Sequence, residues 1–413
     1  MSSEKHAEKH AEKPTPTLQS PLRAQLEKCG AEFAVANTVA GGIEAVATFG
    51  STESEYWALK EAAGLMDLSH RGRLLVSGPD AARWLHGMST NEVKALPVGH
   101  GNHAMFLNAH GHILSDGRVF RFAEDQFLID CDPLRAEALR ESMEKHIIAD
   151  QVEVRDVRAT LACLAMEGPT SRELLRQAVG FEPPNMQPLE SLEIPAETIV
   201  AVGPAGPTCD AVQPLRMARA RITSETGFWL WSSPERIADI WNKSVELGLV
   251  LGVIPVGMDA VEICRVEAGL PRCGAEMIEK TLLQEALPES RVARFVSYTK
   301  GCYIGQEIVE RVRSRGSVHR QLMGLLFDGP QEVAAGEEVK FMADTGYVHA
   351  GTVTSVAYSF GLRRAIALAM LDTGKLHTGK MGEHAEPGKT VEVGPLSAEI
   401  SALPFFFPTA RYQ

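Results

Sequence analysis

Residues 73–80 read Arg-Leu-Leu-Val-Ser-Gly-Pro-Asp, an apolar strand that ends in a turn, and a helix is expected to follow with Ala81, Trp84 and Leu85 on one face. Residues 161–170 repeat the pattern, because another apolar strand ends in Gly-Pro-Thr before a second amphipathic stretch. Proline followed by Asp or Thr is typical of a helix start whose free N–H groups are capped. Two such units predict a duplicated α+β architecture, with a chance resemblance as the alternative.

The pattern changes after about residue 320. Short runs rich in Val, Ile and aromatic residues follow, separated by glycines and prolines, at 323–327, 338–341, 347–358, 364–370, 390–393 and 398–403. Such runs are typical of an antiparallel sandwich or a small barrel, so we expect a separate C-terminal β-domain. At the other end, residues 1–20 are rich in Glu, Lys and His and predict a solvated, disordered tail. His6 and His10 in that tail lack a third ligand for a metal.

Composition excludes several classes of protein. The chain has 413 residues, enough for two or three domains, and carries 41 basic against 53 acidic residues, a formal charge of −12. A protein this acidic is not expected to bind nucleic acid directly, and any anion site in it must be locally basic. No apolar run reaches the roughly 18 residues of a membrane-spanning helix. Seven cysteines without a Cys-x-x-Cys spacing argue against a zinc ribbon or a disulfide scaffold, and predict a reducing, cytoplasmic location.

Residues 300–307 read Lys-Gly-Cys-Tyr-Ile-Gly-Gln-Glu, and the pattern becomes helical from about Tyr303. Cys302 would then lie at or just before a helix N-terminus, two residues from Lys300, and both features favour the reactive thiolate. The flanking glycines would let a ligand approach the sulfur. The alternative is a buried cysteine that only packs. Arginines downstream, at 311, 313, 315 and 320, form either a local anion attractor or a solvated helix surface.

The 300–307 motif resembles the signature of the YgfZ family, whose members bind folate and act in iron–sulfur protein maturation. The wider chain is similar to the GcvT-like aminomethyltransferase superfamily, since residues 66–70, 107–111 and 265–269 resemble its Phe-Asp-Val-Ser-His, Leu-Asn-Ala-x-Gly and Arg-Leu-Glu-Ala-Gly segments. The resemblance implies a three-domain cloverleaf with a central folate channel. Residues 21–70 with 153–257 would form the first α+β domain, 71–152 with 258–320 the second, and 321–413 the barrel.

The resemblance also implies ligands for tetrahydrofolate or a derivative. Glu225 matches the glutamate that holds the pterin, where a carboxylate can accept two parallel hydrogen bonds. Arg265 matches an arginine placed beside the cofactor's carboxylates, and Asn108, Asp116 and Tyr303 complete the implied folate site. The alternatives are an exposed turn carboxylate for Glu225 and an inter-domain ion pair for Arg265.

Two departures from the superfamily pattern bear on activity. Ser115 and Asp116 stand where working aminomethyltransferases have two aspartates, and the first of these, the catalytic carboxylate, is Ser115 here. Asp116 follows, but on a strand its side chain points to the other face. Arg71 and Val261 stand at the positions that match tryptophans placed near folate in YgfZ proteins. Histidines at 100, 103, 110 and 112 suggest polar channel lining rather than a metal site, because no Cys or carboxylate lies at a matching spacing.

These observations favour a tetrahydrofolate-binding accessory protein without aminomethyl transfer. It would support iron–sulfur proteins or their assembly factors, and tRNA modification indirectly, with Cys302 and Lys300 as the acting residues. One alternative is a folate-dependent aminomethyltransferase or demethylase that uses Asp116 or a histidine as a substitute group. The other is a scaffold that uses these domains only for protein contacts.

Overall fold

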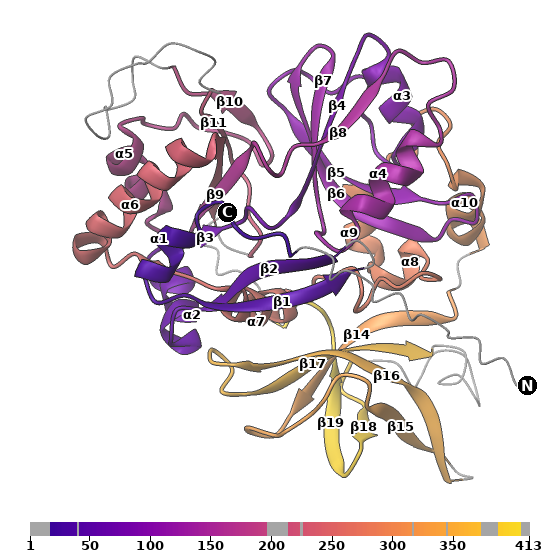
Figure 1. Ribbon diagram of the computed structural model, residues 1–413. Coiled ribbons are helices and arrows are strands. Elements are labelled where there is room, and N and C mark those ends of the chain that lie inside the picture. Colours follow the sequence, from indigo (N-terminus) through magenta and orange to yellow (C-terminus); the bar gives the residue numbers. More distant parts are fainter. Residues whose placement is uncertain are drawn as a thin grey trace, which may run out of the picture.

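The computed structural model describes residues 17–38, 41–195, 214–223, 226–315, 318–343, 346–372 and 387–405. Two α+β domains lie side by side and a β-barrel lies beneath them (Figure 1). This arrangement confirms the expected α+β fold with a C-terminal antiparallel barrel. In these residues no helix is both long and apolar enough to cross a membrane. The expected tail lies outside the described residues as far as residue 16, whereas Leu18 pairs with Ile43 and Ser20 donates to buried Asp67.

The first domain is built on a six-stranded sheet whose pairs are antiparallel except for the last, β3 with β13. In spatial order its strands are β10 (Ser191–Glu193), β11 (Arg216–Ala218), β12 (Gly227–Ser232), β9 (Ala162–Glu167), β3 (Gly64–Asp67) and β13 (Ile254–Pro255). One face packs on helices α1 (Arg23–Lys28), α5 (Ser171–Val179) and α6 (Pro234–Leu251). The other face carries Trp229 and Trp231, and it packs towards the second domain.

The second domain is built on a five-stranded antiparallel sheet. Its spatial order is β5 (Gly101–Leu107), β6 (Ile113–Ala123), β7 (Gln126–Cys131), β4 (Gly72–Ser77) and β8 (Glu153–Asp156). Alternate side chains pack on helices α3 (Ala81–Met88) and α4 (Ala136–Glu144). The opposite face contributes Phe120 and Leu128 to the core that holds Trp229 and Trp231. The two sheets therefore pack on each other through the faces that their own helices leave free.

The remaining elements pack around the two sheets and the barrel. They are the hairpin β1 (Glu32–Thr38) and β2 (Gly41–Thr48), and the helices α2 (Thr52–Glu61), α7 (Met258–Glu267), α8 (Leu283–Ala286), α9 (Glu289–Phe295) and α10 (Gln306–Arg315). Helix α7 contacts β2, α2 and the barrel strands, so it lies between the first domain and the barrel (Figure 1). The hairpin had no equivalent in the sequence analysis.

The C-terminal strands close into a barrel, which decides between the two architectures left open by the sequence. They are β14 (Arg320–Phe327), β15 (Glu338–Ala343), β16 (Gly346–Ser359), β17 (Arg364–Asp372), β18 (Thr390–Val393) and β19 (Leu396–Ser401). Strand β14 pairs with both β17 and β19, which closes the circle. Buried Val, Ala, Leu and Ile side chains from every strand fill the interior.

Both expected strand-turn-helix units are present, as β4 followed by α3 and β9 followed by α5. Gly78 and Gly168 have the same φ of +128° in the two turns, a conformation that favours glycine. A Cβ atom would lie 2.2 Å from Gln151 O at the first glycine and 2.6 Å from Ala62 O at the second. The predicted capping is wrong, because neither Asp80 nor Thr170 caps its helix through its side chain.

Candidate functional site

A row of ionisable side chains crosses the second sheet on the face that packs towards the first domain. In the strand register His103 of β5 pairs with Arg118 of β6, Arg118 pairs with Asp130 of β7, and Asp130 pairs with Arg73 of β4. Cross-strand partners share a face of a sheet. Four neighbouring strands thus present one carboxylate between two arginines, with a histidine beside the second arginine, on the face between the two domains.

Asp130 is the buried anion of this row, at 0% exposure. Arg71, which stands where the family resemblance would have a tryptophan, donates a hydrogen bond from Nε to Asp130 Oδ1 (2.8 Å), and its Nη2 lies 2.6 Å from the same oxygen in an ion pair. Although burial opposes it, Asp130 raises the pKa of Arg71. Asp130 Oδ2 and Arg118 Nε have no hydrogen-bond partner among the described residues. The row therefore holds one buried acceptor atom and one buried donor atom that lack hydrogen-bond partners among the described residues.

Trp229 of β12 faces this row from the first domain. The guanidinium carbon of Arg118 lies 4.6 Å from the ring centre and that of Arg71 lies 5.8 Å away. Both distances suit cation–π contact. Burial, followed by repulsion from Arg71, lowers the pKa of Arg118.

Ser115 and Asp116 point to opposite faces of strand β6. Ser115 is fully buried on the face that packs on the helices, and its hydroxyl donates to the Asp116 carbonyl (2.8 Å). Asp116 is half-buried and lies one alternation from Arg118, on the face that packs towards the first domain. The carboxylate on the inter-domain face is therefore that of Asp116, whereas the decisive role that the family resemblance gives to position 115 stays a prediction.

Two further groups surround Asp116. The Cys273 thiol donates to Asp116 Oδ1 over 3.6 Å, and burial raises the pKa of this thiol. Asp132 follows β7 on the same side of the sheet, and burial together with the Asp116 charge raises its pKa. Asp116 therefore lies among acidic, basic and thiol groups rather than in open solvent.

The segment before residue 225 is fixed to this cluster. Arg118 Nη2 donates to the Arg221 carbonyl (2.8 Å). Glu167 accepts hydrogen bonds from the backbone N–H groups of Ile222 (2.7 Å) and Thr223 (3.0 Å). Glu225, the expected pterin ligand, lies outside the described residues. The residues that precede it belong to the candidate site.

Asn108 organises the turn between β5 and β6. Its Oδ1 accepts from the backbone N–H groups of His110 (2.9 Å) and His112 (3.1 Å). The 300–307 motif packs against this turn, since a Cβ on Gly305 would lie 2.8 Å from the Asn108 carbonyl oxygen. The contacts of Asn108 are thus with the chain itself.

Lys300 and Cys302 do not form a pair. Lys300 is buried, and its Nζ donates to the carbonyl of His86 and to those of Ser89 (2.6 Å) and Asn91 (2.8 Å), beyond the end of α3. Burial lowers the pKa of Lys300 to about 8. Cys302 is exposed, and helix α10 begins four residues later, at Gln306.

Tyr303 is buried, with its ring 5.3 Å from Lys300 Nζ and its hydroxyl without a partner among the described residues. The downstream arginines pair with acidic groups of the chain. Arg311 contacts Glu307 (2.6 Å), and Arg313 contacts Glu310 (3.3 Å). These contacts suit the solvated helix surface that was left open as an alternative.

Arg265 is held in a network that joins α7 to the barrel. All five of its N–H groups are engaged, through two hydrogen bonds to Glu262 and one each to Leu270 O, Glu276 (3.0 Å) and Ser355 (2.6 Å). Glu276 also accepts from Ser355 (2.6 Å) and Thr354 (2.8 Å) of β16. The structure therefore gives Arg265 the inter-domain contacts that were the alternative to a folate contact.

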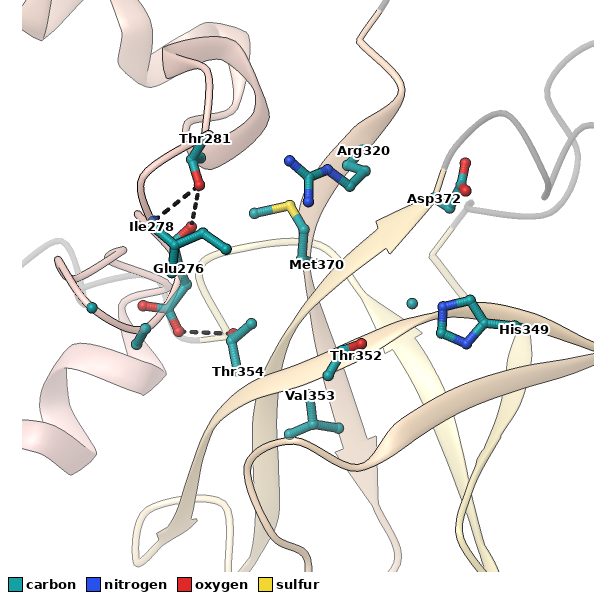
Figure 2. Close-up of a pocket in the computed structure, with 13 residues that line it drawn as sticks. Glu276, Ile278, Thr281, Arg320, His349, Thr352, Val353, Thr354, Met370 and Asp372 are labelled. Carbon is teal, nitrogen blue, oxygen red and sulfur yellow. Dashed lines mark hydrogen bonds between the residues drawn. The ribbon is translucent and has the colours of Figure 1, made fainter. Parts of the chain in front are cut away.

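A cavity of about 440 Å³ lies between the 274–281 loop and the barrel (Figure 2). Its polar lining includes Glu276, Thr281, Arg320, His349, Thr354 and Asp372. Arg320 is paired with buried Glu285 (3.1 Å), and His349 with Glu338 (2.7 Å). Arg320, one of the arginines of the possible anion attractor, lines this cavity, whereas the described residues predicted to bind folate or to act in the 300–307 motif do not.

No group of three or more His, Cys, Asp or Glu side chains in the described ranges is arranged to hold a metal ion. The sequence patterns did not predict Arg118 and Asp130 of the row on the second sheet, nor Glu167 and Trp229 of the first domain. The signal that could have revealed part of it is the i, i+2 spacing of Asp116 and Arg118 on a predicted strand.

Comparisons with known proteins agree on one family. Residues 22–300 match the GCVT N-terminal domain, and residues 320–406 match the glycine cleavage T-protein C-terminal barrel domain. An aminomethyltransferase of Streptomyces coelicolor is 30% identical over 363 residues, covering 87% of this chain and 90% of the relative. An aminomethyltransferase of Corynebacterium aurimucosum is 29% identical and covers 95% and 99%. The crystal structure of the glycine cleavage system aminomethyltransferase T from Bartonella henselae superimposes with a TM-score of 0.76 at 22% identity, covering 96% of this chain and 99% of that one.

Proposed function

The chain belongs to the glycine cleavage T-protein family, and from this premise we propose that it is a tetrahydrofolate-dependent one-carbon transferase, an aminomethyltransferase or a demethylase acting on an amine donor. The names of the relatives support this reading over an accessory role without transfer. The accessory role without transfer, which was inferred from Ser115, thus gives way to the alternative of a transferase that uses Asp116.

The position of Asp116 is the observation that carries the proposal. A reaction that moves a one-carbon unit from an amine to a folate nitrogen develops positive charge and releases a proton. A carboxylate can balance that charge or accept that proton, whereas a neutral hydroxyl cannot. Asp116 is half-buried on the inter-domain face, beside the open donor of Arg118 and the open acceptor of Asp130.

Tetrahydrofolate, when bound, would supply the nitrogen atoms that accept the one-carbon unit. The donors and acceptors of the row fit such a ligand, because a pterin edge carries both N–H groups and a carbonyl oxygen. Arg118 Nε is a donor and Asp130 Oδ2 an acceptor without a partner among the described residues. The Asp116 carboxylate, whose Oδ1 accepts from the Cys273 thiol, is a further acceptor. Glu225 would hold the pterin edge, as the family resemblance implies, with Asn108 and Tyr303 as further contacts.

Calorimetry and a turnover assay test the proposal. Tetrahydrofolate titrated into the full chain should release or absorb heat and raise the melting temperature. A panel of donors should give a folate product with at least one member. An aminomethyl group carried on a thiol should yield methylene-tetrahydrofolate, with ammonia and the free thiol as leaving groups, whereas an N-methylated amine should yield methyl-tetrahydrofolate and the demethylated amine. Binding of tetrahydrofolate without turnover across the panel would favour the accessory role without transfer. Absence of binding would favour a scaffold that uses these domains only for protein contacts.

The exposure of Cys302 favours a second candidate function, the accessory role for iron–sulfur proteins. Among the described cysteines, Cys29 is half-buried, four are buried and Cys302 is exposed. The Lys300 contacts fasten the loop that presents this thiol. Cys302→Ala should abolish complementation of a strain lacking a YgfZ family member if this role holds. Full rescue of that strain by Cys302→Ala, together with no rescue by Asp116→Asn, would favour the transferase over the accessory role of Cys302.

A further inference from the structure

Glu167 is a buried carboxylate at the end of β9, at 0% exposure. Its Oε1 accepts from Ile222 N (2.7 Å) and Trp229 Nε1 (2.9 Å). Its Oε2 accepts from Thr223 N (3.0 Å) and Thr223 Oγ1 (2.5 Å). Burial raises the pKa of Glu167, and these hydrogen bonds oppose that effect.

The groups that contact the Glu167 carboxylate are donors and require an acceptor. Two backbone N–H groups and an indole N–H can only donate, so both carboxylate oxygens must accept. The Glu167 side chain is tightly packed, because a Cβ on Gly227 would lie 2.4 Å from Glu167 Cγ. The 222–223 backbone and the indole of Trp229 are therefore held by one rigid group.

Arg118 holds the same two features from the opposite domain. It donates to the Arg221 carbonyl, and its guanidinium faces the Trp229 ring at 4.6 Å. Arg118 shares its strand and its face with Asp116. Glu167 and Arg118 thus contact the same backbone segment, 221–223, and the same ring, that of Trp229. Both features lie beside Asp116.

We propose that Glu167 is a positioning residue for the folate site, which fixes the backbone at Ile222–Thr223 and the ring of Trp229 through its four accepted hydrogen bonds. This inference rests on the proposed function. Glu167 does not touch the reacting atoms. It sets where the segment before residue 225 and the ring beside Arg118 stand, and the affinity for tetrahydrofolate depends on both.

Glu167→Gln tests the inference with almost no change in shape. In either orientation the new NH₂ group faces at least one obligate donor, so a buried N–H loses its acceptor. The expected result is a loss of tetrahydrofolate affinity of about tenfold or more by calorimetry. Thr223→Val removes one of the four hydrogen bonds and should weaken binding less.

Glu55→Gln is the matched control. Glu55 is also buried, and it accepts from Thr48 Oγ1 (2.6 Å), Phe49 N (2.7 Å) and Gly257 N (2.8 Å), away from the row on the second sheet. It should lose thermal stability comparably while keeping the wild-type affinity for tetrahydrofolate. The Glu167 and Glu55 variants are compared at matched fractions of folded protein.

The outcomes separate the inference from its premise. Wild-type affinity in Glu167→Gln, or an equal loss in Glu55→Gln, would overturn the positioning role while leaving the folate site intact. If Glu167→Gln does not fold, Thr223→Val decides, and unchanged affinity in that variant would overturn the inference. Absence of tetrahydrofolate binding in the wild type would overturn both the inference and the proposed function.

Discussion

Ser115 and Asp116 are consecutive residues of strand β6 whose side chains lie on opposite faces of the second sheet. Ser115 is sealed on the helix-covered face, whereas Asp116 shares the inter-domain face with Arg118. A comparison of sequence positions alone treats the two residues as one motif. The alternation of the strand separates them, and it leaves a carboxylate on the face where the two domains meet.

Arg265→Met should destabilise the protein strongly. The substitution leaves Glu276, a fully buried carboxylate, without its cation, and breaking a buried pair in this way costs about 3–5 kcal/mol. Urea unfolding measures the change. Arg272→Met is the control, because Arg272 is half-exposed and contacts Glu262 only at 3.6 Å, so its loss should cost about 0.5 kcal/mol or less. Unchanged stability of Arg265→Met with lost tetrahydrofolate binding would make Arg265 a direct ligand instead.

Gly78→Ala and Gly168→Ala should each lower the free energy of unfolding by about 3 kcal/mol or more. Each alanine would carry a strained φ of +128°, and its Cβ would clash with a backbone carbonyl oxygen. Gly50→Ala is the matched control, since its φ is +114° but no atom lies within 4 Å of its Cβ position. That variant should lose only the conformational part, about 1 kcal/mol. Equal losses in all three would show that the close approach is unimportant.

His103→Gln should reduce the sensitivity of the protein to acid. Burial, followed by the charges of Arg118, Arg294 and Arg221, lowers the pKa of His103 to about 3. The unfolded chain, with a histidine pKa of about 6.5, therefore binds a proton that the folded state does not bind between pH 6.5 and 3. The contribution of neutral His103 to the free energy of unfolding is therefore fully present above pH 6.5, and it decreases as the pH falls towards 3.

Urea unfolding at pH 7.5 and pH 5.0 measures this effect. The wild type should lose about 1–2 kcal/mol more than His103→Gln between the two pH values, because one proton contributes about 1.4 kcal/mol per pH unit. The same carboxylates titrate in both proteins and cancel in the difference. Parallel losses would mean that His103 is protonated in the folded state.

The sequence predicted the fold where pattern and local geometry agree. The alternating C-terminal runs became the barrel strands, and the two strand-turn-helix units became β4–α3 and β9–α5. The caps were predicted wrongly because the Asp80 carboxylate accepts from Gln151 N, a partner from another segment. The helix after Cys302 was predicted about three residues too early, because Gly305 at φ +83° belongs to the turn that precedes it.

The site was harder to predict, because its parts meet only through strand pairing. Asp130 lies between Arg118 and Arg73 across three strands, and no sequence spacing shows that. Lys300 was predicted to activate Cys302 from two residues away, yet its ammonium group donates to three carbonyls in the last turn of α3 and just after it. Proximity along the chain is a poor guide where a buried cation needs several acceptors.

The rate of tetrahydrofolate-dependent one-carbon transfer in Asp116→Asn and Ser115→Ala distinguishes a catalytic role of Asp116 from one of Ser115. We expect a loss of about 10²–10³-fold for Asp116→Asn with tetrahydrofolate still bound, and a rate within a few-fold of wild type for Ser115→Ala. A wild-type rate in Asp116→Asn, or a loss confined to Ser115→Ala, would contradict the catalytic role of Asp116.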